Sequence, residues 1–221
     1  MEEGTKLAYD IDHGRTPPPD PDLQAAMYEW SEERLSFLKE GYRQYEISNW
    51  ARAGEECRHN LVYWRNGEWL GLGAGAHSHW MGNGKWEMGE AVSYRFADVY
   101  SPKQYVQRVQ ETVERGIDAS AASAAALLKS MRQVAYSEQQ RAETAMSDTA
   151  ILALRLNEGL EIADFRQRFG KAPDEVFGPA LDEMTAVGLL ERQNGSFRGR
   201  IRLTPRGRLL ANEVFVRLLP E

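Results

Sequence analysis

Hydrophobic residues recur at helical spacing just after a proline-rich stretch that begins at Pro17. The apolar positions follow a period of three to four residues: Leu23, Met27, Trp30, Phe37 and Leu38. Asp20 can cap the first turn, and Pro21 suits the first helical position because no N–H is needed there. These features predict a helix from Pro21 up to Gly41, a residue that favours a helix end.

The following stretches change to the pattern of strands. Residues 42–50, YRQYEISNW, alternate as a half-buried strand does and predict one strand. Residues 67–75, GEWLGLGAG, predict a second strand that runs into glycine. Another helix is expected to open at Ser101-Pro102 and to end at Gly116. Helices and strands in this order indicate an α/β fold.

Residues 117–136 interrupt that order. They are rich in alanine and serine and predict a helical connector without chemistry of its own. Ser137 to Gln140, SEQQ, then match a capping box. A helix is therefore expected from there to about Leu156, closed by Gly159.

The C-terminal residues predict a small, mostly helical domain. Two short helices are expected over residues 162–170 and 173–188, and Asn194-Gly195 indicates a hairpin turn between two strands. One last helix carries four apolar residues, Leu209, Leu210, Val214 and Leu218. Helices followed by a β-ribbon and a helix are typical of a winged-helix-like domain.

The composition is that of an ordinary globular protein. The chain has 221 residues, of which 42% are hydrophobic and 27% charged. No apolar run reaches the roughly 18 residues that a membrane span needs, and the acidic first residues predict no secretory signal. One cysteine excludes an internal disulfide and favours the cytoplasm. The net charge of −6 predicts no bulk affinity for nucleic acid.

One segment gathers most of the soft ligands of the chain. Residues 57–80 hold the only cysteine, three of the four histidines and three of the six tryptophans. Each residue alone is better explained as structural, but together they favour a bound group. The first hypothesis is a zinc site, for which the candidate ligands are Cys57, His59, His77 and His79. Their spacing matches no common zinc motif.

Two other hypotheses concern larger ligands. In one, the exposed backbone N–H groups of the glycine run GLGAG, residues 71–75, cradle a phosphate or the edge of a cofactor. In the other, His59 is an axial ligand of haem iron, and Tyr63 and Trp64 pack on the macrocycle. The candidate partners of the haem propionates are Arg52, Arg58 and Arg65. Chemistry alone does not rank these two hypotheses.

The same segment resembles the HemW family, radical-SAM proteins that are related to oxygen-independent coproporphyrinogen III oxidase and regarded as haem chaperones. Three motifs carry the resemblance: Tyr45-Glu46-Ile47-Ser48-Asn49, His59-Asn60-x-x-Tyr63-Trp64, and Gly73-x-Gly75-Ala76-His77-Ser78. Residues 2–8 resemble the loop after a mid-barrel strand. The end of the chain resembles the C-terminal domain of the family.

This resemblance implies three regions. Residues 1–118 would be the second half of a partial (β/α) radical-SAM-type barrel, residues 119–136 the alanine-rich connector, and residues 137–221 the winged-helix-like C-terminal domain of the HemN type. The family binds a [4Fe–4S] cluster through a C-x-x-x-C-x-x-C loop and S-adenosylmethionine through a glycine-rich segment. Neither is present here, so we expect this chain to be a C-terminal portion without catalytic residues of its own.

The function implied is the binding of haem and its transfer to an acceptor protein. The haem-binding residues would be His59, Asn60, Tyr63, Trp64, Arg58 and Arg65. His59 would ligate the iron, with Cys57 as the alternative ligand. The residues in contact with a cofactor would be Gly73, Gly75 and His77.

Two alternatives to the haem chaperone stay open. One is an enzyme of the coproporphyrinogen III oxidase type, and the other is a nucleic-acid-binding module. The acidic residues of the candidate recognition helix, Asp174, Glu175, Asp182 and Glu183, argue against DNA as a partner. A membrane-associated haem acceptor and a second copy of the chain remain open as partners.

Overall fold

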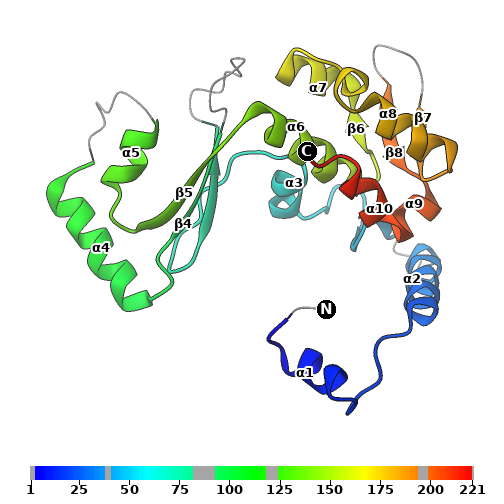
Figure 1. Ribbon diagram of the computed structural model, residues 1–221, viewed down its shortest axis with the longest axis horizontal. Coiled ribbons are helices and arrows are strands. Elements are labelled where there is room, and N and C mark those ends of the chain that lie inside the picture. Colours follow the sequence, from blue (N-terminus) through cyan, green and yellow to red (C-terminus); the bar gives the residue numbers. More distant parts are fainter. Residues whose placement is uncertain (1–2, 38–40, 82–92, 118–123, 194–198, 221) are drawn as a thin grey trace. The chain divides into compact units, whose positions relative to one another are not determined.

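The computed structural model describes residues 3–37, 41–81, 93–117, 124–193 and 199–220 (Figure 1). The chain forms two compact units. One comprises Met1–Gln44 and Ser48–Glu56, and the other comprises Tyr45–Ile47 and Cys57–Glu221. Among the described residues, no helix is both long enough and apolar enough to cross a membrane.

The first unit contains the helices α1 (Lys6–Asp12) and α2 (Pro21–Ser36). Helix α1 begins in a segment that was expected to be a loop. Thr5 is its N-cap, because the Thr5 side chain accepts a hydrogen bond from the Ala8 N–H. The predicted start of α2 is confirmed, since the Asp20 carboxylate accepts the N–H groups of Asp22 and Leu23.

The end and the packing of α2 differ from the prediction. The helix stops at Ser36, well before Gly41, and buries none of its residues. Its apolar positions face solvent, with Trp30 64% and Phe37 78% exposed. Leu38, the last residue of the predicted stripe, lies outside the described residues.

Residues 42–50 form two strands, so the prediction of one strand was wrong. They are β1 (Arg43–Glu46) and β2 (Asn49–Ala51), and a turn at Ile47 and Ser48 separates them. The tripeptide Tyr45–Ile47 belongs to the second unit. Its Ile47 N–H donates to the Arg155 carbonyl oxygen at 3.1 Å, and its Tyr45 carbonyl accepts the Asn157 N–H at 3.0 Å.

The first part of the second unit is built on an antiparallel sheet in the order β3-β4-β5 (Figure 1). Its strands are β3 (His77–Trp80), β4 (Ser93–Asp98) and β5 (Val134–Gln140). The helices of this part are α3 (Arg58–Trp64), α4 (Pro102–Arg115) and α5 (Ala124–Ser130). The prediction of α4 is confirmed, with Ser101 as its N-cap and Gly116 at φ 76° as its end.

Two predictions in this part were wrong. Residues 67–75 form only an isolated bridge, between Trp69 and His79, and the strand begins after the glycines, at His77. The capping box at Ser137 to Gln140 is part of strand β5, where Phe96 of β4 pairs with Ser137 and Ser93 pairs with Gln140. Pairing with a distant strand therefore overrides the local capping pattern.

The remaining residues form the C-terminal domain. Its sheet has the antiparallel order β6-β8-β7. The predicted helices at 162–170 and 173–188 are confirmed, whereas the last predicted helix is divided at Leu210, whose φ is −111°. The elements are α6 (Ala142–Arg155), β6 (Leu160–Glu161), α7 (Ile162–Phe169), α8 (Pro173–Ala186), β7 (Leu190–Gln193), β8 (Arg200–Leu203), α9 (Pro205–Leu209) and α10 (Ala211–Val216).

Strands β7 and β8 pair antiparallel, as a hairpin would, but the predicted turn at Asn194-Gly195 lies outside the described residues. Gly159 was expected to close a helix. The helix ends earlier, at Arg155, and Gly159 instead allows close packing, because a Cβ there would lie 2.3 Å from the Ile201 carbonyl oxygen.

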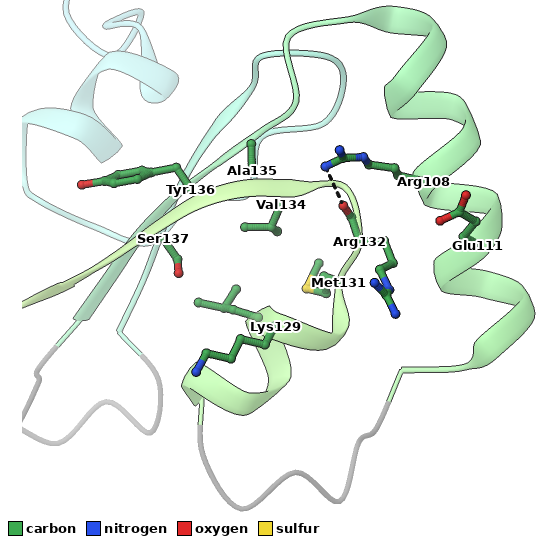
Figure 2. A pocket seen from close by; sticks show the side chains of 10 residues that line it. Arg108, Glu111, Lys129, Met131, Arg132, Val134, Ala135, Tyr136 and Ser137 are labelled. Atoms are coloured by element: carbon green, nitrogen blue, oxygen red, sulfur yellow. Dashed lines mark hydrogen bonds between the residues drawn. The ribbon is translucent and has the colours of Figure 1, made fainter.

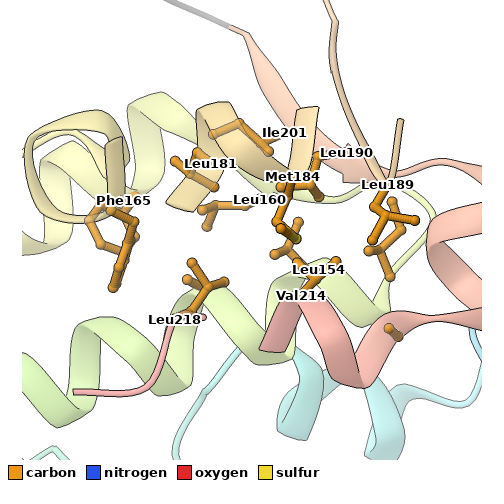
Figure 3. Close-up of a cluster of buried hydrophobic side chains, with 14 of the residues drawn as sticks. Leu154, Leu160, Phe165, Leu181, Met184, Leu189, Leu190, Ile201, Val214 and Leu218 are labelled. Carbon is orange, nitrogen blue, oxygen red and sulfur yellow. The ribbon is translucent and has the colours of Figure 1, made fainter. Parts of the chain in front are cut away.

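One apolar core holds this domain together (Figure 3). It takes side chains from each of its helices except α9 and from all three strands of its sheet. Those with the least exposure are Ala150, Leu154, Phe165, Leu181, Ile201, Val214 and Leu218, each at 1% or less. Since α6 also borders α3, this core supports the part of the chain that carries the predicted ligands.

Candidate functional site

Helix α3 carries the predicted haem motif on its exposed side. Cys57 occupies the N-cap position without a side-chain capping bond, and Cys57, Arg58 and His59 are exposed. The His59 ring meets the edge of the Tyr63 ring at a centroid distance of 4.7 Å, because residues four apart share one face of a helix. No hydrogen bond joins the His59 ring to another of the described residues, so both ring nitrogens are available to a ligand.

Behind these two rings, an aromatic row leads from the surface into the interior. Tyr63 packs against Trp69 at 4.5 Å, and Trp69 packs against His79 at 5.0 Å. The side chain of His79 is only 1% exposed. The row thus holds the Tyr63 ring between Trp69 on one side and His59 on the other.

His79 is a buried neutral imidazole. Its Nδ1 donates to the Gly67 carbonyl oxygen at 2.7 Å, and its Nε2 has no hydrogen-bond partner among the described residues. Burial lowers the pKa of His79; the hydrogen bond to Gly67 opposes this effect, while the charges of Arg95 and Arg168 add to it. Sequence reasoning treated this residue only as a zinc ligand.

The other side of α3 faces the C-terminal domain. The Arg155 guanidinium lies over the Trp64 ring at 4.4 Å, and it pairs with the buried Glu46 at 3.8 Å. Arg65 pairs with Glu158 at 3.2 Å. Tyr63 and Trp64 therefore point in different directions, since adjacent helical residues are about 100° apart. Only Tyr63 lies next to His59, and Asn60 is half-buried on the same helix.

The end of α3 is held by buried polar contacts. Asn66 is fully buried and adopts a φ of 47°, which is uncommon for a residue with a side chain. Its amide nitrogen donates to the Thr149 hydroxyl at 3.0 Å. Arg168 donates to the carbonyl oxygens of Asn66 at 2.9 Å and of Arg65 at 3.4 Å.

The glycine run has a structural explanation. A Cβ at Gly71 would lie 2.3 Å from the His77 carbonyl oxygen, and Gly75 adopts a φ of 72° beside the Tyr100 ring. Some of the backbone N–H groups in and beside this run are used within the protein, and Gly71 donates to the Ser78 hydroxyl at 3.0 Å. Gly75 donates to Val99 at 2.9 Å and Ala76 donates to Gly73 at 3.1 Å. His77 is exposed at the start of β3.

The zinc hypothesis finds no support in the arrangement. Within the described part of the chain, no three side chains of histidine, cysteine, aspartate or glutamate come together as metal ligands would. The four proposed zinc ligands are therefore not brought to one point.

Of the cavities that lie apart from the exposed side of α3, two carry several basic side chains. The larger, about 490 Å³, is bounded by α4, α5 and β5 and includes Arg108, Lys129 and Arg132 (Figure 2). One side of it is braced by Arg108, which donates to the Arg132 carbonyl oxygen at 3.5 Å. The other, about 290 Å³, includes Arg65 and Arg168. The first contains none of the predicted site residues.

Comparison with known proteins agrees with these features. Residues 141–210 match the family model of the HemN C-terminal domain. The heme chaperone HemW of Mycobacterium tuberculosis is 35% identical over 219 residues, which are 99% of this chain and 45% of that protein. The heme chaperone HemW of Bacillus subtilis is 30% identical over 208 residues, 94% of this chain and 46% of that protein.

This chain is homologous to the C-terminal portion of HemW proteins. It spans about half the length of the relatives it matches. A solved structure, the radical SAM enzyme coproporphyrinogen III oxidase (HemN) from Escherichia coli, superposes with a TM-score of 0.56 at 17% identity, over 90% of this chain and 42% of that one. That likeness shows a shared α/β fold, as expected from the sequence. It does not extend to activity.

Proposed function

We propose that this chain contributes to the binding of haem and to its transfer to an acceptor protein. The homology to HemW heme chaperones, which are about twice as long as this chain, supports this function. The observation that carries it to particular residues is the exposed His59 on α3, which packs against the half-buried Tyr63 and has imidazole nitrogens without a hydrogen-bond partner among the described residues. An imidazole beside an aromatic ring suits a haem iron and its flat macrocycle.

The roles within this proposal follow from position. His59 would ligate the iron, and Tyr63 would contact the macrocycle from one side. Arg58, which is exposed next to His59, would meet a propionate, whereas Arg65 already pairs with Glu158. Trp64 and Asn60 would act by fixing the helix. Cys57 remains the alternative ligand, and Gly73, Gly75 and His77 would shape the adjoining loop.

The test is a titration of the purified chain with haemin, followed by absorption in the Soret region. His59→Ala should weaken haem binding and alter the Soret band, because the bond to iron is lost while apolar contacts stay. Cys57→Ser and His77→Ala should keep the wild-type spectrum.

His13→Ala provides a matched control, since His13 is also exposed and stacks on a tyrosine four residues away, Tyr9, at 3.9 Å. If His77→Ala alters the spectrum and His59→Ala does not, His77 is the ligand. If the wild-type chain binds no haem, the proposal fails for this chain.

The iron–sulfur chemistry of radical-SAM relatives does not fit these residues. A [4Fe–4S] cluster takes three or four cysteine thiolates, and this chain has Cys57 alone. After anaerobic treatment with iron and sulfide, the chain by itself should release no 5′-deoxyadenosine from S-adenosylmethionine. Stoichiometric release would contradict that expectation.

The proposal also includes the partners, the cellular location and the domain boundaries of the chain. We expect the haem acceptor to be a protein, with a membrane-associated acceptor and a homodimer as further partners to be tested. We also expect a cytoplasmic location. The division into residues 1–118, 119–136 and 137–221 remains a proposal, and strand β5 crosses the second of these boundaries.

A further inference from the structure

The C-terminal end of α3 is held from two other helices at once. Thr149 reaches Asn66 from α6, and Arg168 reaches the backbone at Arg65 and Asn66 from α7. These contacts join residues that are 83 to 103 positions apart in sequence. We infer that Arg168 is a positioning residue for α3, through which the C-terminal domain fixes the direction of the His59 imidazole. The inference rests on the proposed function.

The burial, the hydrogen bonds and the charge of Arg168 suit this positioning role. Its guanidinium is largely buried, and it donates to the Asn66 carbonyl oxygen at 2.9 Å, the Arg65 carbonyl oxygen at 3.4 Å and the Met81 sulfur at 3.1 Å. Burial lowers the pKa of Arg168 to about 10, so the side chain remains a cation at neutral pH. A cation is favourable at the end of a helix, where carbonyl groups lack internal partners.

The geometry of a guanidinium matters as much as its charge. The planar group can direct N–H donors to two carbonyl oxygens together, whereas a lysine ammonium is a point charge. Two bonds from one rigid group restrict rotation of the backbone at the end of α3. Asn66 adds to this restriction, because its φ of 47° turns the chain and its side chain is bound to Thr149.

The held end lies close to the proposed iron ligand. His59 and Asn66 are separated by about two helical turns, or about 10 Å along an axis. A short helix that is free at its end would let the imidazole take several directions. Held by Arg168, it presents one direction, which favours one geometry of iron ligation and a slower loss of haem.

The experiment compares Arg168→Gln and Arg168→Lys with Arg166→Gln. Arg166 lies on the same helix, is exposed, and pairs at the surface with Glu175 at 3.5 Å. Hydrogen–deuterium exchange of residues 58–66 is measured without haem, and haemin titration is measured separately. Thermal unfolding reports whether the C-terminal domain stays folded.

In Arg168→Gln, exchange in residues 58–66 should accelerate by about tenfold or more, since bonds from a charged donor are lost. The dissociation constant for haem should rise by about tenfold, with a broadened Soret band. Arg168→Lys should recover part of both effects, and Arg166→Gln should change neither. If Arg168→Gln does not fold, Thr149→Val tests the same helix end from α6.

Unchanged exchange in residues 58–66 overturns the inference whether or not haem binds. Faster exchange with unaltered haem affinity and spectrum also overturns it, because the contact would then be structural only. Absence of haem binding by the wild-type chain is a different result. It removes the proposed function and the haem-positioning role with it, while the exchange data still decide whether Arg168 holds α3.

Discussion

The second unit contains two buried regions of opposite character. Among the residues that the structure describes, the core of the C-terminal domain comprises fifteen buried hydrophobic side chains. Between this domain and the β3-β4-β5 sheet lies a polar seam, defined here by the buried residues Asn66, His79, Ser93, Gln140 and Thr149, none of which is more than 8% exposed.

The two regions contribute to the fold in different ways. Apolar contacts depend little on direction, so the core stabilises the domain without fixing one orientation of its neighbours. Hydrogen bonds in the seam require particular partners, as where Ser93 donates to Gln140 at 2.8 Å and Gln140 donates to Asp148 at 2.8 Å. The core stabilises the fold of the domain, and the seam bond from Asn66 to Thr149, at 3.0 Å, holds the end of α3 on it.

The largest effect should follow from opening the apolar core. Leu181→Ala removes a side chain that is 1% exposed, and we expect a loss of about 2–5 kcal/mol in the free energy of unfolding. Urea unfolding measures the change. Leu219→Ala, at a position 56% exposed, should cost less than about 0.5 kcal/mol and is the control. Equal losses in both variants would contradict the assignment of the core.

A smaller but more local effect is expected in the polar seam. Thr149→Val keeps the shape of the side chain and leaves the Asn66 amide without its partner, which should cost about 1–3 kcal/mol. Thr149→Ser keeps the hydroxyl and should cost less. Hydrogen exchange should show that residues 58–66 lose protection before the residues of the core do. A uniform loss across the domain would show that the seam and the core act as one unit.

The third prediction concerns pH. The pKa of His79 is lowered in the folded protein, so the unfolded chain takes up the proton first as pH falls below about 6.5. Stability should therefore decrease with falling pH, by up to about 1.4 kcal/mol per pH unit in this window. Urea unfolding at several pH values should give a flatter profile for His79→Gln.

His13→Gln, at an exposed histidine, should leave the slope of the wild-type profile unchanged. If His79→Gln keeps the wild-type slope as well, another group is responsible for the acid sensitivity.

The smallest effect is expected at the surface of the C-terminal domain. Arg192 pairs with Asp174 at 2.6 Å and with Asp182 at 3.4 Å, and Arg217 pairs with Glu183 at 2.9 Å. Arg192→Ala should change stability by less than about 1 kcal/mol, as for other surface ion pairs.

The same carboxylates neutralise arginines that DNA would need. We therefore predict no sequence-dependent binding to DNA in a gel-shift assay at physiological salt. Micromolar binding that depends on sequence would overturn this prediction.

Local signals in the sequence predicted local structure well. Asp20 and Ser101 cap the helices that they were expected to cap, and Gly116 and Gly170 end theirs. Strand β5 could not be predicted in this way. The residues from Ser137 to Gln140 match a capping box, but in the structure they pair with β4. Non-local hydrogen bonds leave no local trace in the sequence.

The candidate site, too, could be predicted only as far as its contacts are local in sequence. The H-N-x-x-Y-W spacing already implies that His59 and Tyr63 share a face and that Trp64 turns away from it. It gives no hint of Arg168, which comes from a helix about a hundred residues later. His79 and Thr149 were equally hidden, since their roles depend on burial and on partners brought together by the fold.

The tripeptide Tyr45–Ile47 limits where chimaeras between related proteins can be joined. It belongs to the second unit by its contacts, yet the residues after it, Ser48–Glu56, belong to the first. A graft that starts at Cys57 would carry α6 without the backbone groups that pair with Arg155 and Asn157. The transferable module is therefore discontinuous, and a chimaera should keep Tyr45–Ile47 and the C-terminal domain from the same parent.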